Sequence, residues 1–224
     1  PCPAGPREGG RRADMGRTFR YLFAMLWGAV PALALFFLLR PLRLRRLEGK
    51  GLSSPARREV ALALFWMFCG GAALLGLTPR WVVPALAGLP LGMPWNQAGL
   101  PFFSPGTVSL VPFLTFSYSA YILAANVGLF LPFGLFPALL FRGFGWRRAL
   151  VAGGCITLLI ETCQLFIGRT FDVDDLMLNT LGVFCGFLLG GAVRRLFPRF
   201  AAGFAVRTAL QEGGRNRDRQ NDLS

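Results

Sequence analysis

The stretch from Val60 to Phe141 limits the possible folds of this chain more than any other feature. Its 82 residues contain a single charged side chain, Arg80. A soluble domain of this length needs many more charges to cover its surface, whereas apolar runs of about 20 residues are typical of membrane spans. Over the whole chain, 54% of the residues are hydrophobic and 16% are charged. The sequence therefore predicts an all-α, polytopic membrane protein and excludes a soluble globular domain.

Five apolar runs are long enough to cross a bilayer as helices. They are Phe19–Leu39, Val60–Leu77, Tyr121–Phe141, Ala149–Ile167 and Leu176–Val193. The apolar 78–120 connection, which is rich in Pro and Gly, contains two shorter runs that we expect to lie in the interface or to re-enter the membrane, Trp81–Met93 and Thr107–Tyr118. We divide the rest of the chain into an N-terminal two-span region with its outer connection (15–106), a three-span core (107–193) and a basic tail (194–224).

The cations between the spans predict the orientation of the protein. Segment 40–59 carries seven Lys and Arg residues, segment 142–148 carries three, and the chain after Val193 carries seven more. The connections 78–120 and 168–175 carry one each. Because cytoplasmic loops of multi-pass proteins are enriched in Lys and Arg, we expect the C-terminus to be cytoplasmic and the protein to lie in the plasma membrane. The same loops account for the net charge of +13, so nucleic-acid binding is not predicted.

The first 20 residues fit this topology poorly. Five spans with an internal C-terminus place the N-terminus outside, yet this segment contains five Arg residues. We expect translation to begin at Met15 and residues 1–14 to be a disordered or non-native extension. The tail from Gly213 has the polar composition of a disordered segment.

Polar residues gather around the junction between the fourth and fifth runs, in the sequence ETCQLFIGRTFDVDDLMLN (161–179). Glu161 and Gln164 share one helix face, and Asp172, Asp175 and Asn179 share another. The short turn at 168–171 predicts an antiparallel hairpin in which Glu161 faces Asn179 and Gln164 lies opposite Asp175. Asn126 lies at a similar depth in the third run. We therefore expect three helices to direct polar side chains to one level in the outer third of the bilayer.

These residues are the candidate site. An ionised carboxylate near the bilayer centre costs about 2.5–3.5 kcal/mol or more, so it must face a partner or a water-filled cavity. The catalytic candidates are Glu161, Arg169, Asp172 and Asp175, and the binding candidates are Asn126, Gln164 and Asn179. Arg169 can pair with Asp172 or Asp175, or can hold an anionic group. Structural roles compete with these functions, because Asp172 suits a helix N-cap and the amides suit interhelical hydrogen bonds.

No cofactor or metal site is predicted. The sequence contains no His, no CxxC pair, and no P-loop, GxSxG, HExxH or dinucleotide-binding motif. The stripe Gly182, Gly186 and Gly190 predicts close packing of the last helix against a neighbour.

Three stretches resemble the VanZ-like family of bacterial integral membrane proteins. They are VSLVPF (108–113), NVGLFLPFG (126–134) and IETCQLFIGRTFDVDDLMLNTLG (160–182), and the resemblance covers roughly 107–193. The last stretch is the specific one, and it places the polar residues of the family at the seven candidate positions given above. The family commonly has Asn before LxPF, where this chain has Ser109.

The resemblance implies a protein of the bacterial envelope associated with low-level resistance to the glycopeptide teicoplanin. On this basis we expect the outward polar pocket to engage a cell-wall, lipid-linked or peptidoglycan-related molecule, with membrane lipids as the surrounding partners. Two other function classes are compatible with the residues. One is a membrane-embedded hydrolase or transferase with Glu161 or an Asp as the base, and the other is a small proton-coupled transporter that uses Glu161.

Overall fold

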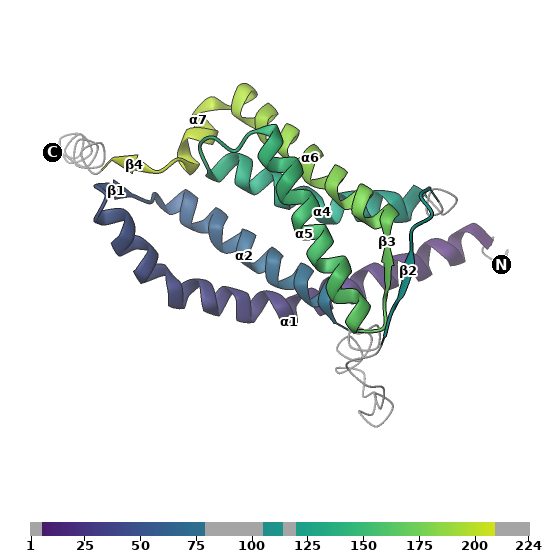
Figure 1. The fold of residues 1–224 in the computed structure, drawn as a ribbon. Coiled ribbons are helices and arrows are strands. Elements are labelled where there is room, and N and C mark those ends of the chain that lie inside the picture. The colour runs from purple at the N-terminus through teal and green to yellow at the C-terminus, as the bar shows by residue number, and fades with distance from the viewer. Residues whose placement is uncertain (1–5, 79–104, 114–119, 209–224) are drawn as a thin grey trace, which may run out of the picture.

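The computed structural model describes residues 6–78, 105–113 and 120–208, and its five long helices run between the same two ends of the molecule (Figure 1). They are α1 (Pro6–Glu48), α2 (Ala56–Leu77), α4 (Ala120–Leu140), α5 (Trp146–Phe166) and α6 (Val173–Leu196). Each is long and apolar enough to cross a membrane. The prediction of an all-α, polytopic bundle with about five spans is confirmed.

The two ends of the bundle differ in chemistry because the connections at each end differ. The α1–α2 connection, the α4–α5 turn and the segment after α6 lie together and carry most of the described cations, so we call this the basic end. The α5–α6 connection lies at the opposite end beside Glu161, Asp172 and Asp175, which we call the carboxylate end. Beyond the N-terminal part of α1, most cations and the carboxylate cluster therefore lie at opposite ends of the bundle, as the sequence pattern predicts.

Glycines allow α4, α5 and α6 to pack with their backbones close together. A Cβ atom on Gly182 or Gly186 of α6 would overlap backbone carbonyls of α4, and one on Gly190 would lie 2.6 Å from the Cβ of Ala138. A Cβ on Gly153 of α5 would approach the Val183 side chain to 3.1 Å. The predicted close packing of the glycine stripe is confirmed, and it fixes the relative depth of the polar residues on these three helices.

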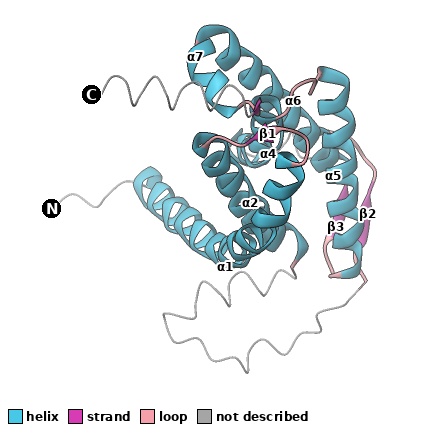
Figure 2. Cartoon of the chain, turned by 90° about the vertical axis from the view of Figure 1, so that its left-hand side faces the viewer, coloured by secondary structure: helices cyan, strands magenta, loops and turns pink. Residues whose placement is uncertain are grey.

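The α1–α2 hairpin is joined to this core through α2, and α1 lies along its outer side (Figure 2). Aromatic rings make the contact between α2 and α4. Phe65 stacks on Phe136 with ring centroids 5.3 Å apart, and Phe68 meets Phe133 edge-on at 5.4 Å. Such ring pairs prefer offset or edge-to-face geometry and add to the burial of apolar surface. The hairpin is therefore packed against the core along the length of α2.

Two short sheets join distant parts of the chain at the two ends. At the basic end, β1 (Leu52–Ser53) pairs antiparallel with β4 (Arg207–Thr208). At the carboxylate end, β2 (Thr107–Ser109) pairs in parallel with β3 (Thr170–Asp172). The sequence analysis did not predict these strands, because two or three residues are too few to show an alternating pattern. Strand β2 lies within the 78–120 connection. Its pairing with β3 places the described part of this connection, residues 105–113, at the carboxylate end.

Part of the predicted basic tail is folded onto the basic end. The short helix α7 (Pro198–Ala201) and a 3₁₀ turn (Ala202–Phe204) lead from α6 to β4. At the other terminus, α1 is helical from Pro6, including residues 6–14. The start at Met15 and the division of the chain into regions stay predictions, and Trp81–Met93 and the tail from Gly213 lie outside the described residues.

Candidate functional site

Glu161 lies at the centre of the α5–α6 connection. Its side chain is 1% exposed, and its Oε2 atom accepts a hydrogen bond of 3.0 Å from the backbone N–H of Asp172. Asp172 in turn caps α6, because its Oδ1 atom accepts the N–H of Asp174 at 3.0 Å. The N-cap role that competes with catalysis for Asp172 is therefore present in the structure. Glu161 holds the start of α6 against the outer part of α5.

Asp174 connects the α5–α6 junction to the VSLVPF segment. Its side chain is fully buried, and its Oδ1 atom accepts the backbone N–H of Phe113 at 2.6 Å. Phe113 has a φ of 68°, which is a strained conformation for a bulky residue and one that persists only where its surroundings hold it in place. Sequence reasoning did not include Asp174 among the candidates. Only the parallel pairing of β2 with β3, which brings 107–109 beside 170–172, reveals its role.

Asn126 brings the third core helix into the site. Its Nδ2 atom donates a hydrogen bond of 2.7 Å to Oδ1 of Asp175, which joins α4 to α6. A hydrogen bond to a charged group contributes about 1.5–3 kcal/mol. The structure therefore contains the convergence of three helices that the spacing predicts, with Asn126 paired to Asp175.

The end of α2 also forms part of the site. The last four carbonyl groups of a helix lack partners within it. Gln164 donates to the carbonyl of Gly76 at 3.1 Å, and Arg169 donates through Nη1 to that of Leu75 at 2.8 Å. A cation at this position also complements the negative end of the helix dipole. Gln164 therefore binds α2, and Asp175, which the spacing places opposite it, is hydrogen-bonded to Asn126 instead.

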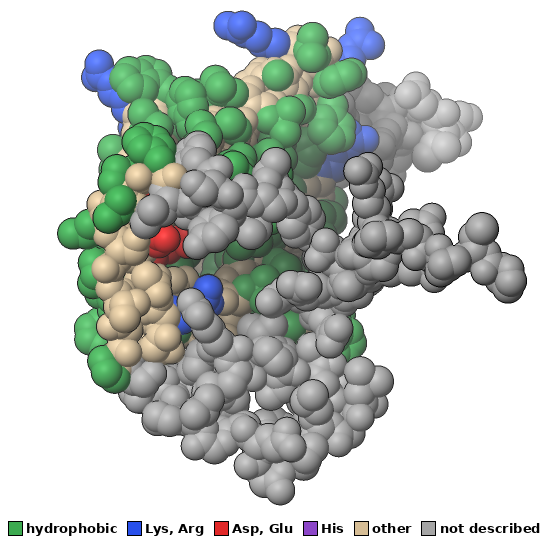
Figure 3. Space-filling model, turned by 90° about the vertical axis from the view of Figure 1, so that its right-hand side faces the viewer, with side chains coloured by type: hydrophobic (Ala, Val, Ile, Leu, Met, Phe, Trp, Pro, Cys, Tyr) green, Lys and Arg blue, Asp and Glu red, His purple; other side chains and the backbone are tan. Residues whose placement is uncertain are grey.

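The guanidinium of Arg169 lies within the electrostatic reach of several carboxylates. Its charge acts on both Glu161 and Asp175, and the charge of Asp172 acts on the same two carboxyl groups. Figure 3 shows acidic and basic side-chain atoms near each other on this end of the molecule. Among its described residues, the site thus combines the guanidinium of Arg169 with four acidic groups, and it can interact with a ligand that carries both an anionic group and hydrogen-bond donors.

Two polar side chains lie one helical turn further into the bundle, and the buried hydroxyl of one of them, Thr157, has no hydrogen-bond partner within the described part of the chain. Asn179 is 5% exposed and lies one turn from Asp175, and Thr157 is fully buried and lies one turn from Glu161. The packing of Gly153 against Val183 sets the two helices so that these residues face the same interior region. Burying such a group without a partner costs about 1–3 kcal/mol in proteins. These groups can therefore serve a bound molecule or water.

The described residues contain no group of three or more His, Cys, Asp or Glu side chains arranged to hold a metal ion. The donors and acceptors available to a ligand are thus carboxylates, amides, a hydroxyl and one guanidinium. They are suited to recognising sugar hydroxyls, ammonium groups and phosphate or carboxylate groups through hydrogen bonds and charge.

Comparison with known proteins identifies a family over the part of the chain that contains these residues. The family model described as VanZ/LLP1 matches residues 81–194. This range includes α4, α5, α6, β2 and β3, and it excludes the α1–α2 hairpin whose end contacts Arg169 and Gln164. The comparisons with curated proteins and with solved structures gave no match. The chain therefore belongs to the VanZ/LLP1 family.

Proposed function

We propose that the carboxylate end binds the polar headgroup of a lipid-linked or peptidoglycan-related envelope molecule, and that this binding alters susceptibility to glycopeptides such as teicoplanin. The observation that carries the proposal is the position of Thr157 and Asn179. The Thr157 hydroxyl is buried without a hydrogen-bond partner within the described residues, Asn179 is 5% exposed, and both lie directly inside a cluster that contains Arg169 and four acidic side chains. A headgroup entering this cluster satisfies polar groups that the protein itself leaves unpaired.

A lipid-linked ligand fits both the polar and the apolar parts of this region. Sugar hydroxyls donate to the partly exposed carboxylates of Asp172 and Asp175, and a phosphate or carboxylate pairs with the planar guanidinium of Arg169. The outer half of α5 presents exposed apolar side chains next to the cluster, with Leu159 64% exposed and Phe166 63% exposed. These side chains give the lipid chain a contact surface while its headgroup occupies the site.

The hydrogen bonds of the acids favour binding over general base catalysis. Glu161 and Asp172 already accept backbone N–H groups, and Asp175 accepts the Asn126 amide, so all three help to position the chain. A hydrolase or transferase is the alternative if product forms from a bound envelope lipid. Proton-coupled transport, the other alternative, is favoured by the burial of Glu161 within a span and requires flux that depends on a pH gradient.

Replacing Glu161 by Gln tests the functional role while preserving the fold. The amide oxygen of the substituted side chain still accepts the Asp172 N–H, but the charge is lost. Teicoplanin susceptibility is measured in cells that express the wild type, Glu161→Gln, or Glu48→Gln, which changes an exposed acid at the basic end. We expect Glu48→Gln to behave as the wild type and Glu161→Gln to behave as cells without the protein. Equal susceptibility of Glu161→Gln and wild-type cells at equal abundance would contradict the proposal.

The proposed orientation places the carboxylate end outside the cell and the basic end in the cytoplasm of a bacterium. The uneven distribution of Lys and Arg between the two ends supports it. Reporter fusions after Lys50 and Arg207 should report a cytoplasmic location, and a fusion after Thr170 should report an extracytoplasmic one. A cytoplasmic signal at Thr170 would reverse the orientation and remove the outward site.

A further inference from the structure

Guanidinium groups converge on the α4–α5 turn at the basic end, far from the carboxylate cluster. Arg148 of α5 donates through Nη1 to the Gly143 carbonyl at 2.9 Å, and Arg194 of α6 donates through Nη2 to the Phe141 carbonyl at 3.3 Å. Arg142 lies in the chain between these two carbonyls. Three arginines therefore lie around residues 141–143. One belongs to the turn, one to α5 and one to α6.

Most of the donors on these arginines remain available to another acceptor. A guanidinium has five N–H groups in a fixed plane, and the bonds to the turn use one from Arg148 and one from Arg194. Arg142 and Arg148 are exposed, and Arg194 is half-buried. The bonds to the turn also restrict the positions of two of the side chains, so less conformational freedom is lost when they bind a ligand.

Acidic side chains do not balance this charge. Segments 142–148 and 194–208 together contain seven Arg residues and no Asp or Glu. Of the described acids at the basic end, Glu48 is exposed on α1, and Glu59 is buried in ion pairs with Arg40 and Arg43. The arginines around the α4–α5 turn therefore present an uncompensated positive surface.

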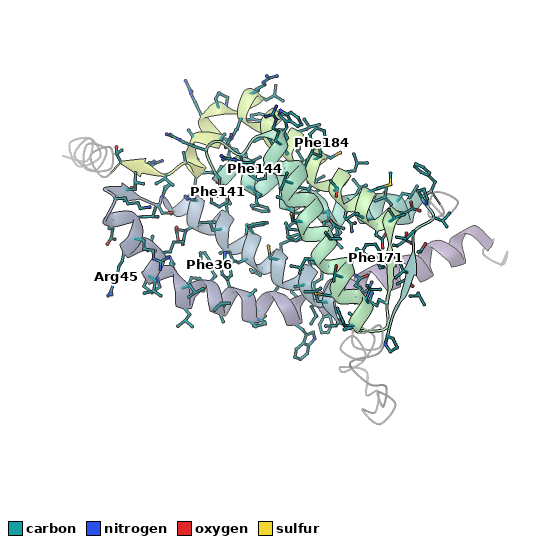
Figure 4. The ribbon with its side chains drawn as sticks, viewed as in Figure 1. Phe36, Arg45, Phe141, Phe144, Phe171 and Phe184 are labelled. Carbon is teal, nitrogen blue, oxygen red and sulfur yellow. The ribbon has the colours of Figure 1, made fainter. Side chains whose placement is uncertain are left out.

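Exposed aromatic side chains surround the same turn. Phe141 is 45% exposed and Trp146 is 54% exposed, and beyond α6 Phe197 and Phe200 are 60% and 50% exposed. Figure 4 places Phe141 and Phe144 at this end and Phe171 at the opposite end of the bundle. Aromatic residues at the ends of spans are typical of the membrane–water interface, the level at which lipid phosphates lie. The turn thus combines an anion-binding surface with apolar groups at the depth of a phospholipid headgroup.

We propose that Arg142, Arg148 and Arg194 form a binding site for the phosphate of an anionic phospholipid. The phosphate oxygens accept the guanidinium N–H groups that the turn leaves unused, and paired N–H groups of one arginine match two phosphate oxygens. The acyl chains lie against the exposed rings of Phe141 and Trp146. This lipid occupies the opposite end of the protein from the proposed envelope ligand and differs from it in function.

The full-length protein, purified and delipidated in detergent, tests the proposal by native mass spectrometry. Phosphatidylglycerol and phosphatidylcholine with identical acyl chains are titrated separately. The variant Arg142→Gln/Arg148→Gln is compared with Arg45→Gln/Arg46→Gln, which removes the same charge from α1 at the same end. Figure 4 places Arg45 well away from Phe141, so this control leaves the turn intact.

We expect the wild type to prefer phosphatidylglycerol and the turn variant to bind it about 30-fold more weakly, since each Arg near an anionic surface contributes about fivefold. The α1 control should retain wild-type affinity. Arg142 makes no hydrogen bond to the turn within the described residues, so the single variant Arg142→Gln repeats the test if the double variant does not fold. Equal binding of the two lipids, or equal losses in the turn variant and the α1 control, would overturn the proposal.

Discussion

Replacing Asn179 by Leu should leave the stability of the protein unchanged or raise it. The two side chains have the same branched shape, but Leu needs no hydrogen-bond partner. Asn179 is 5% exposed and makes no hydrogen bond within the described residues, so an apolar side chain at this position should lose no protein contact and should gain buried apolar surface. Part of this gain is offset where the larger Leu crowds Val183 or Gly182, so we expect a change between zero and about +2 kcal/mol in the free energy of unfolding.

Asn126→Leu is the matched control, because it makes the same change at a similar depth on α4. Asn126 donates to Asp175 at 2.7 Å, and its loss leaves a carboxylate inside the bundle without that donor. We expect Asn126→Leu to cost about 1.5–3 kcal/mol. Both free energies are measured by helical circular dichroism during reversible unfolding in mixed micelles. A loss of stability in Asn179→Leu as large as that in Asn126→Leu would show that Asn179 is structural, and would refute the reasoning that assigns it to a ligand.

Two further predictions concern charges at the two ends. Glu59→Gln removes the buried partner of the arginines on α1 and should lower the free energy of unfolding by about 3–5 kcal/mol. Glu48→Gln changes an exposed acid and should alter it by less than about 0.5 kcal/mol. Thermal unfolding of the two variants checks this, and similar losses of stability in both would contradict it. Arg169→Ala and Thr78→Val each remove one donor from the end of α2, but only the first also removes a cation from the carboxylates. We expect Thr78→Val to lower the free energy of unfolding by about 1 kcal/mol and Arg169→Ala to lower it by more, in the same unfolding assay. Equal losses of stability would mean that the charge of Arg169 contributes nothing to folding.

The sequence was sufficient to predict the helices and the depth of the polar residues, because both depend on local patterns. Apolar run length defines a span, and a rise of about 1.5 Å per residue places Glu161, Asn179 and Asn126 at one level. The close packing of the glycine stripe on α6 could also be predicted from the sequence, since small residues at every fourth position form one face of a helix. These features need no knowledge of which helices are neighbours in space.

The contacts that the sequence could not predict depend on tertiary packing. The partners of Gln164 and Arg169 are carbonyl groups at the end of α2, 88 and 94 residues earlier in the chain, and every residue has such a group. The role of Asp174 likewise depends on Phe113, which reaches it only because β2 pairs with β3. Backbone partners leave no signal in the side-chain pattern, so Gln164 and Arg169 could be chosen as candidates but not assigned their contacts, and Asp174 was not chosen at all.

Binding of a lipid-linked cell-wall precursor to the carboxylate end is the most direct test of the proposed function. The full-length protein in nanodiscs is titrated with a polyprenyl diphosphate-linked disaccharide-peptide, and retained ligand is detected by native mass spectrometry for the wild type and for Asn179→Leu. We predict that the wild type retains the precursor and that Asn179→Leu binds it at least about tenfold more weakly, which corresponds to about 1.4 kcal/mol for one lost hydrogen-bonded contact. Retention of ordinary phospholipids should be the same in both. Equal retention of the precursor by the two proteins, or no retention by either, would contradict the account.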